Sequence, residues 1–357
     1  MRGGERVLEV LCQLYPRAEL FTLVHVNGSV ASSIEGRTVH RSFVQRLPNV
    51  QRWYRHYLPL YPTAVEQFDL DQVDLVISTS HCAIKSLVTP GRVRHLCYCL
   101  TPMRYAWDQF DAYFGPDRVG RWPSRLLKPV LSHLARWDRD TAARADRYVA
   151  ISQHVAQRIA RYYNRRASVV HPPVDTRFYH PATLADDHFL LIVSALVPYK
   201  RIDVAIRASR MAGVPLKIVG VGPERARLQE QAGPTVEFLG NRSDEEVRDL
   251  YRRSAALVMP GEEDFGIAPL EAQACGRPVV ALARGGALET VVDGTTGLLV
   301  GDLSDEALAT AMRDAVATPF DPAVIRRHAE RFGRDRFEAE MAACVEETLA
   351  APVGTRW

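Results

Sequence analysis

The sequence lacks the features of several protein classes. It has no run of about 18 apolar residues and does not open on a charged stretch followed by an apolar one, so we expect neither a membrane-spanning segment nor a secretory leader. Its six cysteines include no C-x-x-C pair of the kind that binds zinc or exchanges disulfides. We therefore expect a cytoplasmic protein whose cysteines are reduced core residues.

Lysine is scarce as well. The chain has 45 Lys+Arg residues, of which only four are lysine, and a lysine in so arginine-rich a chain can mark a site that needs a compact point charge. The four are Lys85, Lys128, Lys200 and Lys217.

The net charge of +3 hides an uneven distribution. Residues 1–180 hold 25 Lys+Arg and 15 Asp+Glu, whereas residues 181–357 hold 20 and 27. A basic amino-terminal half suits an anionic partner such as a phospholipid surface, a phosphorylated acceptor or a nucleic acid.

With 357 residues, 47% of them apolar, the chain is long enough for two cores. Short apolar runs alternate with helical patterns in two series, separated by residues 175–188, which show no periodicity. This alternation predicts an α/β fold of two doubly wound Rossmann-like domains, with ligands in a cleft where the carboxyl ends of the strands face each other. The expected strands are 20–26, 74–79, 95–100, 147–152 and 168–174, then 189–196, 215–222, 236–240, 256–261, 278–283 and 297–300.

The stretch GEEDFGIAPLE carries the strongest chemical signal. It follows an expected strand, and its loop leads into a helix that should open near Pro269. The amides of Gly266 and Ile267 at that helix start suit a diphosphate. Glu263 in the loop and Glu271 in the helix can both reach hydroxyl groups of a ligand lying across the helix end. The alternative is that Glu271 only complements the helix dipole.

Two further strand–turn–helix loops should lie at the same edge of the sheet. SALVPYKRIDVAI (194–206) places Lys200 and Arg201 at the turn, where cations can neutralise phosphate oxygens. VGVGPERARL (219–228) has a glycine turn that allows a ligand to approach the backbone. A Lys-Arg pair at a helix start can also be simply solvated.

Together these segments resemble the retaining nucleotide-sugar glycosyltransferases of family 4, which have the two-domain GT-B fold. EDFGIAPLE reproduces the family's E-x7-E signature, GVGPE its glycine loop and VPYKRID its lysine loop. The resemblance implies that Glu263 contacts the donor sugar, Glu271 contacts the ribose, and Lys200 and Arg201 hold the diphosphate. The implied catalytic residues are Glu263, Lys200 and Arg201, and the implied donor-binding residues are Gly3, Gly4, Gly222, Asp264, Phe265, Gly266, Ile267 and Glu271.

The amino-terminal half resembles the bacterial subgroup that makes surface polysaccharides, several of them mannosyltransferases, through CYCLTPMRYAWD (97–108) and VVHPPVDTRFY (170–179). The resemblance places Leu100, Thr101 and Arg104 in the acceptor or sugar cleft. In this family a glycine pair follows the first strand. Here the pair, with the helix predicted after it, opens the chain, so we expect about ten residues, a strand and a turn, to precede Met1.

Two positions depart from the family pattern. Leu100 stands where members often have a histidine that reaches the donor's hydroxymethyl oxygen. The loss either weakens catalysis or fits a donor without that hydroxyl, such as a 6-deoxyhexose. Ala195 replaces an arginine, so Arg201 would share the phosphate role.

The resemblance implies a metal-independent hexosyltransferase that needs no cofactor. Its donor would be a nucleotide-diphosphate sugar, with mannose or a 6-deoxyhexose favoured, and its acceptor a glycan or a polyprenyl-diphosphate-linked saccharide. The implied domains are 1–178 on the acceptor side, 179–335 for the nucleotide sugar, and a helix over 336–357 that returns to the first domain. Peripheral contact with the anionic inner face of the cytoplasmic membrane is expected, and no nucleic-acid partner.

Three alternatives remain. A nicotinamide-dependent oxidoreductase would also be doubly wound, but GVGPER lacks the third glycine of G-x-G-x-x-G. A metal-dependent transferase would use Asp138 and Asp140 as a D-x-D pair, although their helical pattern favours a solvated helix face. A membrane- or nucleic-acid-binding module without turnover would use residues 46–62, where Arg52 and Arg55 flank Trp53.

Overall fold

The computed structural model describes residues 3–182, 187–352, 355 and 357. The chain forms two compact units: unit 1 contains Met1–His171 and Phe337–Trp357, and unit 2 contains Pro172–Arg336. The sequence analysis places the first boundary after residue 178. In the structure the boundary lies between His171 and Pro172, so the described part of the expected linker 175–188 belongs to unit 2. Val174, just before this linker, pairs with Gly333 of the same unit. Residues 183–186 of the linker lie outside the described residues.

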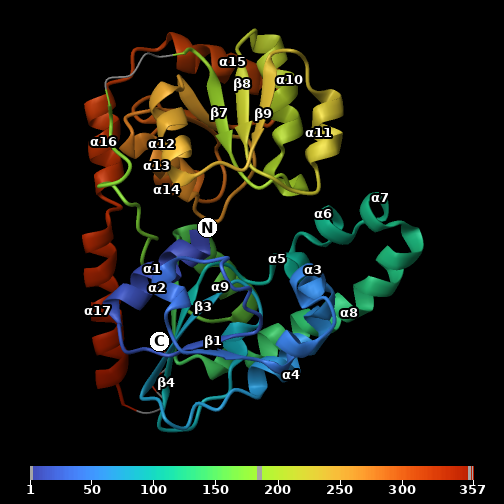
Figure 1. Ribbon diagram of the computed structural model, residues 1–357, viewed down its shortest axis with the longest axis vertical. Coiled ribbons are helices and arrows are strands. Elements are labelled where there is room, and N and C mark those ends of the chain that lie inside the picture. Colours follow the sequence, from blue (N-terminus) through green and yellow to red (C-terminus); the bar gives the residue numbers. More distant parts are fainter. Residues whose placement is uncertain (1–2, 183–186, 353–354, 356) are drawn as a thin grey trace. The chain divides into compact units, whose positions relative to one another are not determined.

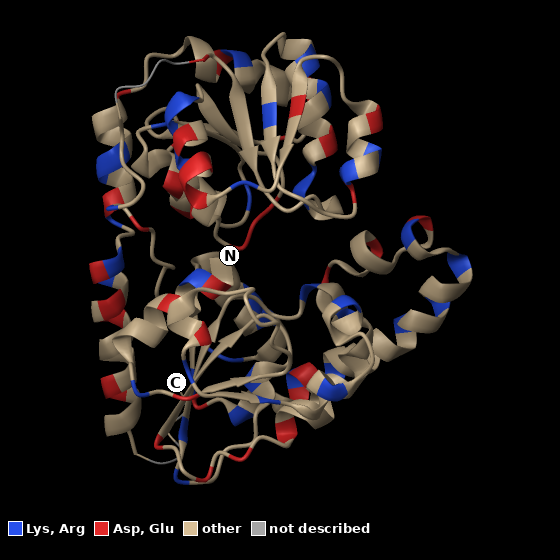
Figure 2. Ribbon diagram, in the orientation of Figure 1, with Lys and Arg blue, Asp and Glu red and all other residues tan. Residues whose placement is uncertain are grey.

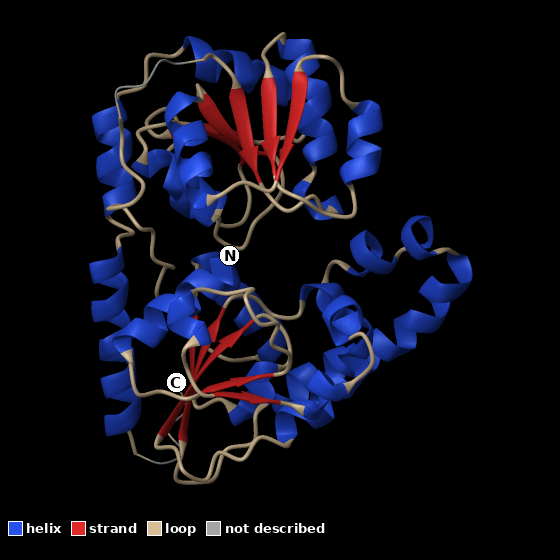
Figure 3. Cartoon of the chain, in the orientation of Figure 1, coloured by secondary structure: helices blue, strands red, loops and turns tan. Residues whose placement is uncertain are grey.

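Unit 2 contains a parallel sheet (Figures 1 and 3), and its strand order is β12-β11-β10-β7-β8-β9. The order runs outward from β7 in both directions, so the sheet has a topological switch point between β7 and β10, the place where doubly wound sheets bind ligands. The strands are β7 (Leu190–Val193), β8 (Leu216–Val219), β9 (Val236–Gly240), β10 (Ala256–Met259), β11 (Val279–Leu282) and β12 (Gly297–Val300).

Helices cover both faces of this sheet because its strands are apolar on both sides. One core cluster joins Ile192 and Val258 of the strands to Ala205 and Met312 of the helices. Ser243 and Glu246 form a capping box that starts one of these helices. The helices are α10 (Ile202–Ala212), α11 (Arg225–Gln231), α12 (Asp244–Arg253), α13 (Ile267–Ala274), α14 (Ala287–Thr290), α15 (Asp305–Ala317) and α16 (Pro322–Glu330), with the 3-10 turn η5 (Pro198–Lys200).

Unit 1 contains a four-stranded parallel sheet in the order β3-β4-β5-β6 and a separate parallel pair, β1-β2. The sequence analysis missed β2, which is three residues long and only partly buried. The two parallel α/β units expected from the sequence are present. The strands are β1 (Leu20–Thr22), β2 (Val39–Arg41), β3 (Leu75–Ser80), β4 (Arg94–Cys99), β5 (Arg147–Ala150) and β6 (Ser168–Val169).

The helices of unit 1 include an excursion of three short helices and one long helix between β4 and β5, which Figure 1 shows extending from the sheet. The helices are α1 (Gly3–Leu14), α2 (Ser32–Glu35), α3 (Val50–Trp53), α4 (Tyr61–Glu66), α5 (Arg104–Trp107), α6 (Phe110–Phe114), α7 (Pro116–Val119), α8 (Arg121–Asp140), α9 (Gln153–Tyr163) and α17 (Arg334–Ala350). The 3-10 turns are η1 (Phe43–Arg46), η2 (Tyr54–Leu60), η3 (Ile84–Ser86) and η4 (Thr141–Arg144).

Helix α17 packs against the sheet of unit 1. The Phe337 ring meets Tyr98 of β4 edge-on at 5.7 Å between centroids, and Arg147 of β5 pairs with Glu347 at 2.8 Å. In the part of the chain that the structure describes, every helix is too short or too polar to cross a bilayer.

The glycine pair lies inside the first helix, although the sequence analysis places the helix after the pair. Gly3 and Gly4 are the first two residues of α1. A Cβ atom on Gly4 would lie 2.7 Å from Cδ1 of Leu100, so the missing side chain lets α1 lie against the end of β4.

His95 of β4 makes the stability of unit 1 depend on pH. Its side chain is fully buried, its Nε2 lies 2.8 Å from Ser78 Oγ, and burial lowers its pKa from 6.5 to about 4. The unfolded chain therefore binds a proton as the pH falls below about 6.5 while the folded chain does not, and the free energy of unfolding decreases with falling pH. We expect this histidine to contribute a loss of about 2 kcal/mol between pH 7.5 and pH 5.

Urea unfolding of the wild type and the His95→Gln variant at both pH values measures this effect. The variant should lose less stability on acidification than the wild type, whereas the variant of an exposed histidine, His133→Gln, should follow the wild type. Equal losses in all three proteins would contradict the assignment.

Candidate functional site

The loops on either side of the switch point in unit 2 bring together two of the predicted site residues. Lys200 ends η5, which follows β7, and Glu263 lies in the loop after β10. The Lys200 ammonium forms an ion pair with the Glu263 carboxylate, and the two side chains are only 17% and 13% exposed. The Lys200 Nζ also lies 5.1 Å from the centroid of the Tyr199 ring. A lysine and a glutamate thus share one partly dehydrated location at the carboxyl edge of the sheet.

Gly261 allows these two loops to touch through their backbones. A Cβ atom at this position would lie 2.6 Å from the Tyr199 carbonyl oxygen and 2.7 Å from the Lys200 Cα. Only a residue without a side chain fits here, so Gly261 sets the distance between Lys200 and Glu263. The sequence analysis did not name this residue.

We expect the Gly261→Ala variant to push η5 away from the loop after β10. The overpacking should lower the free energy of unfolding of unit 2 by about 1–3 kcal/mol, measured by urea denaturation. Gly301→Ala is the matched control, because nothing lies within 4 Å of a Cβ atom built there. A loss no larger at Gly261 than at Gly301 would contradict the proposed role of this contact.

Glu271 is held inside unit 2 by a partner that the sequence analysis did not name. It lies in the second turn of α13, is 6% exposed, and its Oε2 accepts a hydrogen bond of 3.0 Å from the hydroxyl of Tyr251 in α12. No acidic residue lies in the first turn of α13, so Glu271 lies one turn further along the helix than the helix-dipole alternative assumes. The hydrogen bond fixes the rotamer of this carboxylate.

For the other predicted site residues at the start of α13, the backbone is the part that a ligand would contact, because the side chains of two of them are buried. Phe265 is 2% exposed, and its ring packs against Phe332 at 5.9 Å between centroids. Asp264 is also buried. Gly266 is the N-cap of α13 and Ile267 is its first residue. Their amides are therefore among those at a helix start that have no carbonyl acceptor within the helix.

Arg201 and Gly222 have different surroundings from Lys200. Arg201 has a left-handed backbone conformation (φ 50°), and its half-exposed side chain pairs with Asp203 at 3.4 Å. A Cβ atom on Gly222 would lie 2.2 Å from the Leu196 carbonyl oxygen. The glycine loop after β8 therefore makes its close approach to the chain's own loop after β7.

The predicted cleft residues of unit 1 follow β4. The amides of Leu100 and Thr101 both donate to the Ser80 carbonyl at the end of β3, at 2.7 and 3.4 Å. Arg104 begins α5 and is partly buried. Leu100 and Gly4 are brought together, as described above. The loop after β4 is thus tied to the loop after β3 at the carboxyl edge of this sheet.

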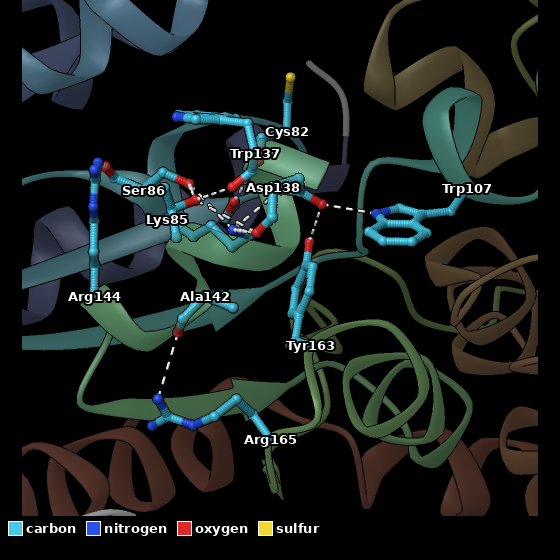
Figure 4. A network of polar contacts seen from close by, with 12 residues as sticks. Cys82, Lys85, Ser86, Trp107, Trp137, Asp138, Ala142, Arg144, Tyr163 and Arg165 are labelled. Atoms are coloured by element: carbon cyan, nitrogen blue, oxygen red, sulfur yellow. Dashed lines mark hydrogen bonds and ion pairs between the residues drawn. The ribbon is translucent and has the colours of Figure 1, made fainter. Parts of the chain in front are cut away.

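Asp138 and Asp140 occupy opposite environments, so the expectation of a solvated helix face is wrong for Asp138. Asp138 is fully buried, and its Oδ1 lies 3.1 Å from the Nζ of Lys85, which is also fully buried (Figure 4). The Trp107 indole and the Tyr163 hydroxyl each donate to its Oδ2 at 2.8 Å. Asp140 is 65% exposed.

Because one side chain is buried and the other is exposed, Asp138 and Asp140 do not form the cluster of carboxylate oxygens that a D-x-D metal site requires. Among residues 3–182 and 187–352, no three His, Cys, Asp or Glu side chains are grouped so that they could hold a metal ion.

Comparison with known proteins gives two family matches that together cover most of the chain. Residues 1–178 match the family model described as Glycosyltransferase Family 4, and residues 176–334 match the one described as Glycosyl transferases group 1. The junction between the matches lies close to the boundary between the units.

Individual relatives match over part of their length. D-inositol 3-phosphate glycosyltransferase of Rhodococcus erythropolis is 33% identical over 230 residues, 55% of this chain and 52% of that protein. The GDP-mannose-dependent alpha-(1-6)-phosphatidylinositol monomannoside mannosyltransferase of Mycolicibacterium smegmatis is 31% identical over 248 residues, 58% of this chain and 65% of that protein. The chain spans about half the length of the inositol-phosphate glycosyltransferases that it matches.

Among solved structures, Anabaena Alr3699/HepE in complex with UDP has a TM-score of 0.72 at 19% identity, covering 97% of this chain and 96% of that chain. At this identity the likeness concerns the fold, which is the expected GT-B fold.

Proposed function

This chain belongs to glycosyltransferase family 4, and on that premise we propose that it transfers a hexose from a nucleotide-diphosphate sugar to an acceptor hydroxyl with retention of the anomeric configuration. The observation that carries the proposal is the pairing of Lys200 with Glu263 at the switch point of unit 2. A cation for a diphosphate and a carboxylate for sugar hydroxyls lie there side by side.

The proposed reaction needs charge stabilisation and no protein nucleophile. The bond between the sugar C1 and the diphosphate oxygen breaks, the acceptor oxygen bonds to C1 on the same face, and the acceptor proton passes to the released diphosphate. Negative charge grows on the diphosphate in the transition state, where Lys200 and the amides of Gly266 and Ile267 would stabilise it. Glu263 would orient the sugar and Glu271 the ribose. Because Lys200 supplies a positive charge, the proposal includes no metal, and chelator should leave turnover unchanged.

We propose mannose or a 6-deoxyhexose as the transferred sugar. Leu100 offers no hydrogen-bond donor or acceptor side chain at the end of β4, which suits a sugar that makes no hydroxymethyl contact there. One relative is named as GDP-mannose-dependent. If the position selects a 6-deoxyhexose, GDP-mannose and its 6-deoxy counterpart should turn over at different rates.

The proposed acceptor is a glycan or a lipid-linked saccharide that carries phosphate. The excess of basic residues over residues 1–180, 25 against 15 acidic, suits such an acceptor and the surface of an anionic membrane, at which the protein would work peripherally. The two relatives named above act on phosphorylated inositol compounds according to their names. The segment 46–62 presents exposed Arg52, Trp53 and Arg55 for membrane contact.

The test is a panel of GDP-, UDP- and dTDP-sugars, in which nucleotide release is measured with and without lipid-linked acceptors. Release from one donor that rises with acceptor, and a product with the donor's anomeric configuration by NMR, would support the proposal. Lipid binding without release from any donor would favour the non-enzymatic module instead.

A further inference from the structure

Helix α8 presents an apolar line of side chains to solvent. Trp122 is 77% exposed, Leu126 is 71% exposed and Val130 is 38% exposed. Side chains four residues apart lie on one face of a helix, so these three form one continuous line. A different face of α8 carries the residues that pack against unit 1, namely Ser124, Leu131, Leu134, Ala135 and Asp138. The apolar line is therefore additional to the packing face.

A basic line runs beside the apolar one. Arg121, Arg125 and Lys128 are exposed and follow each other at spacings of four and three residues. Residues 118–137 contain five arginines and lysines and no aspartate or glutamate. Figure 2 shows this basic colouring along α8. The exposed side of α8 therefore carries an indole and aliphatic groups next to positive charges.

We propose that this exposed side of α8 docks on an anionic lipid surface. Trp122 and Leu126 would enter the boundary between headgroups and acyl chains, where indole rings are favoured, and the three basic side chains would contact lipid phosphates. A second copy of the chain is a poorer occupant, because the acid-free basic lines of two copies would repel each other.

The basic aromatic segment of unit 1, residues 46–62, also contacts α8. Leu58 of η2 packs in the cluster formed by Met103, Leu131 and Leu134, so η2 lies against the packing face of α8. Trp53, beside η2, is 44% exposed. The proposal does not depend on glycosyl transfer. It assigns the larger part of the binding to lipid to α8 rather than to residues 46–62.

The test is co-sedimentation of the full chain with vesicles of phosphatidylcholine alone or with 30 mol% phosphatidylglycerol, a probe composition chosen on the order of the anionic content of cytoplasmic leaflets. Two variants remove the apolar and the basic line: Trp122→Glu with Leu126→Glu, and Arg121→Glu with Arg125→Glu and Lys128→Glu. Two matched controls alter exposed residues of unit 2 by the same charge: Met211→Glu with Val316→Glu, and Arg313→Glu with Arg327→Glu and Arg331→Glu.

We expect the wild type to bind the anionic vesicles in a salt-sensitive way and each α8 variant to bind at least ten-fold more weakly, with both controls unchanged. Brominated lipids should quench tryptophan fluorescence in the wild type and less in Trp122→Phe. Equal binding by the α8 variants and the controls would overturn the proposal. So would a wild-type dimer in solution that the α8 variants dissolve. Nucleotide release with a water-soluble acceptor, measured in parallel, should be equal in all variants, which separates this test from that of the transfer reaction.

Discussion

Replacing Lys200 with alanine is expected to lower the turnover of nucleotide-sugar donors roughly 100- to 1,000-fold, the usual cost of removing one preorganised charge-stabilising group. The Lys200 ammonium is mostly shielded from water, so solvent replaces it poorly when negative charge grows on the departing diphosphate. The variant also leaves the Glu263 carboxylate without this cation close to the diphosphate position. Both effects act on the transition state more than on the bound donor, so kcat should fall more than KM rises.

Lys217→Ala is the matched control for this experiment. Lys217 is the other lysine of unit 2, lies in β8, and pairs with Glu237 at 3.8 Å across the strand pair β8-β9. Its removal should leave kcat within about two-fold of the wild type, because a partly exposed pair of this kind contributes roughly 0–1 kcal/mol to stability. Lys200→Arg should recover part of the lost activity, since it keeps the charge but changes its shape. Near-normal turnover of Lys200→Ala, or an equal loss of turnover in Lys217→Ala, would contradict the electrostatic role proposed for Lys200.

Sequence periodicity predicts much of unit 2 because its strands are short, apolar and bounded by turns. The runs 189–196 and 256–261 contain β7 and β10, and the loops after them carry Lys200 and Glu263 as expected. Periodicity gives no information on which loops touch. The approach of Gly261 to Lys200 joins positions about 60 residues apart, and the Tyr251–Glu271 hydrogen bond joins positions 20 residues apart in two different helices. These contacts depend on the strand order, which the sequence pattern does not specify.

The buried position of Asp138 could have been predicted from the helix pattern. Leu131, Leu134 and Ala135 are apolar and lie seven, four and three residues before Asp138, which places the carboxylate on the buried face of α8. The D-x-D spacing instead groups Asp138 with Asp140, which is exposed. Lys85 gave a comparable signal, as the only charged residue in the mainly apolar run CAIKSLV. A lone lysine in such a run and a lone aspartate on an apolar helix face are candidates for a buried pair, but only the tertiary structure identifies them as partners.

The Lys85–Asp138 pair should therefore be the most sensitive polar contact of unit 1. Asp138→Ala would leave the Lys85 ammonium fully buried without its carboxylate, and would also remove the acceptor of the Trp107 and Tyr163 hydrogen bonds (Figure 4). We expect the free energy of unfolding of unit 1 to fall by about 3–5 kcal/mol. Hydrogen exchange of the β3 and β4 amides measures this loss within unit 1, whatever happens to unit 2.

A double-mutant cycle separates the charge pair from the rest of the network. Lys85→Met alone should be strongly destabilising, but adding it to Asp138→Leu should cost much less than the sum of the single losses, because no buried charge is then left unpaired. Asp140→Ala is the matched control, two residues along the same helix, and should change stability by less than about 0.5 kcal/mol because Asp140 is exposed. Additive losses in the cycle would mean that the two charges do not stabilise each other, and that the role of Asp138 is only to accept the hydrogen bonds of Trp107 and Tyr163 and so to hold α5 and α9 against α8.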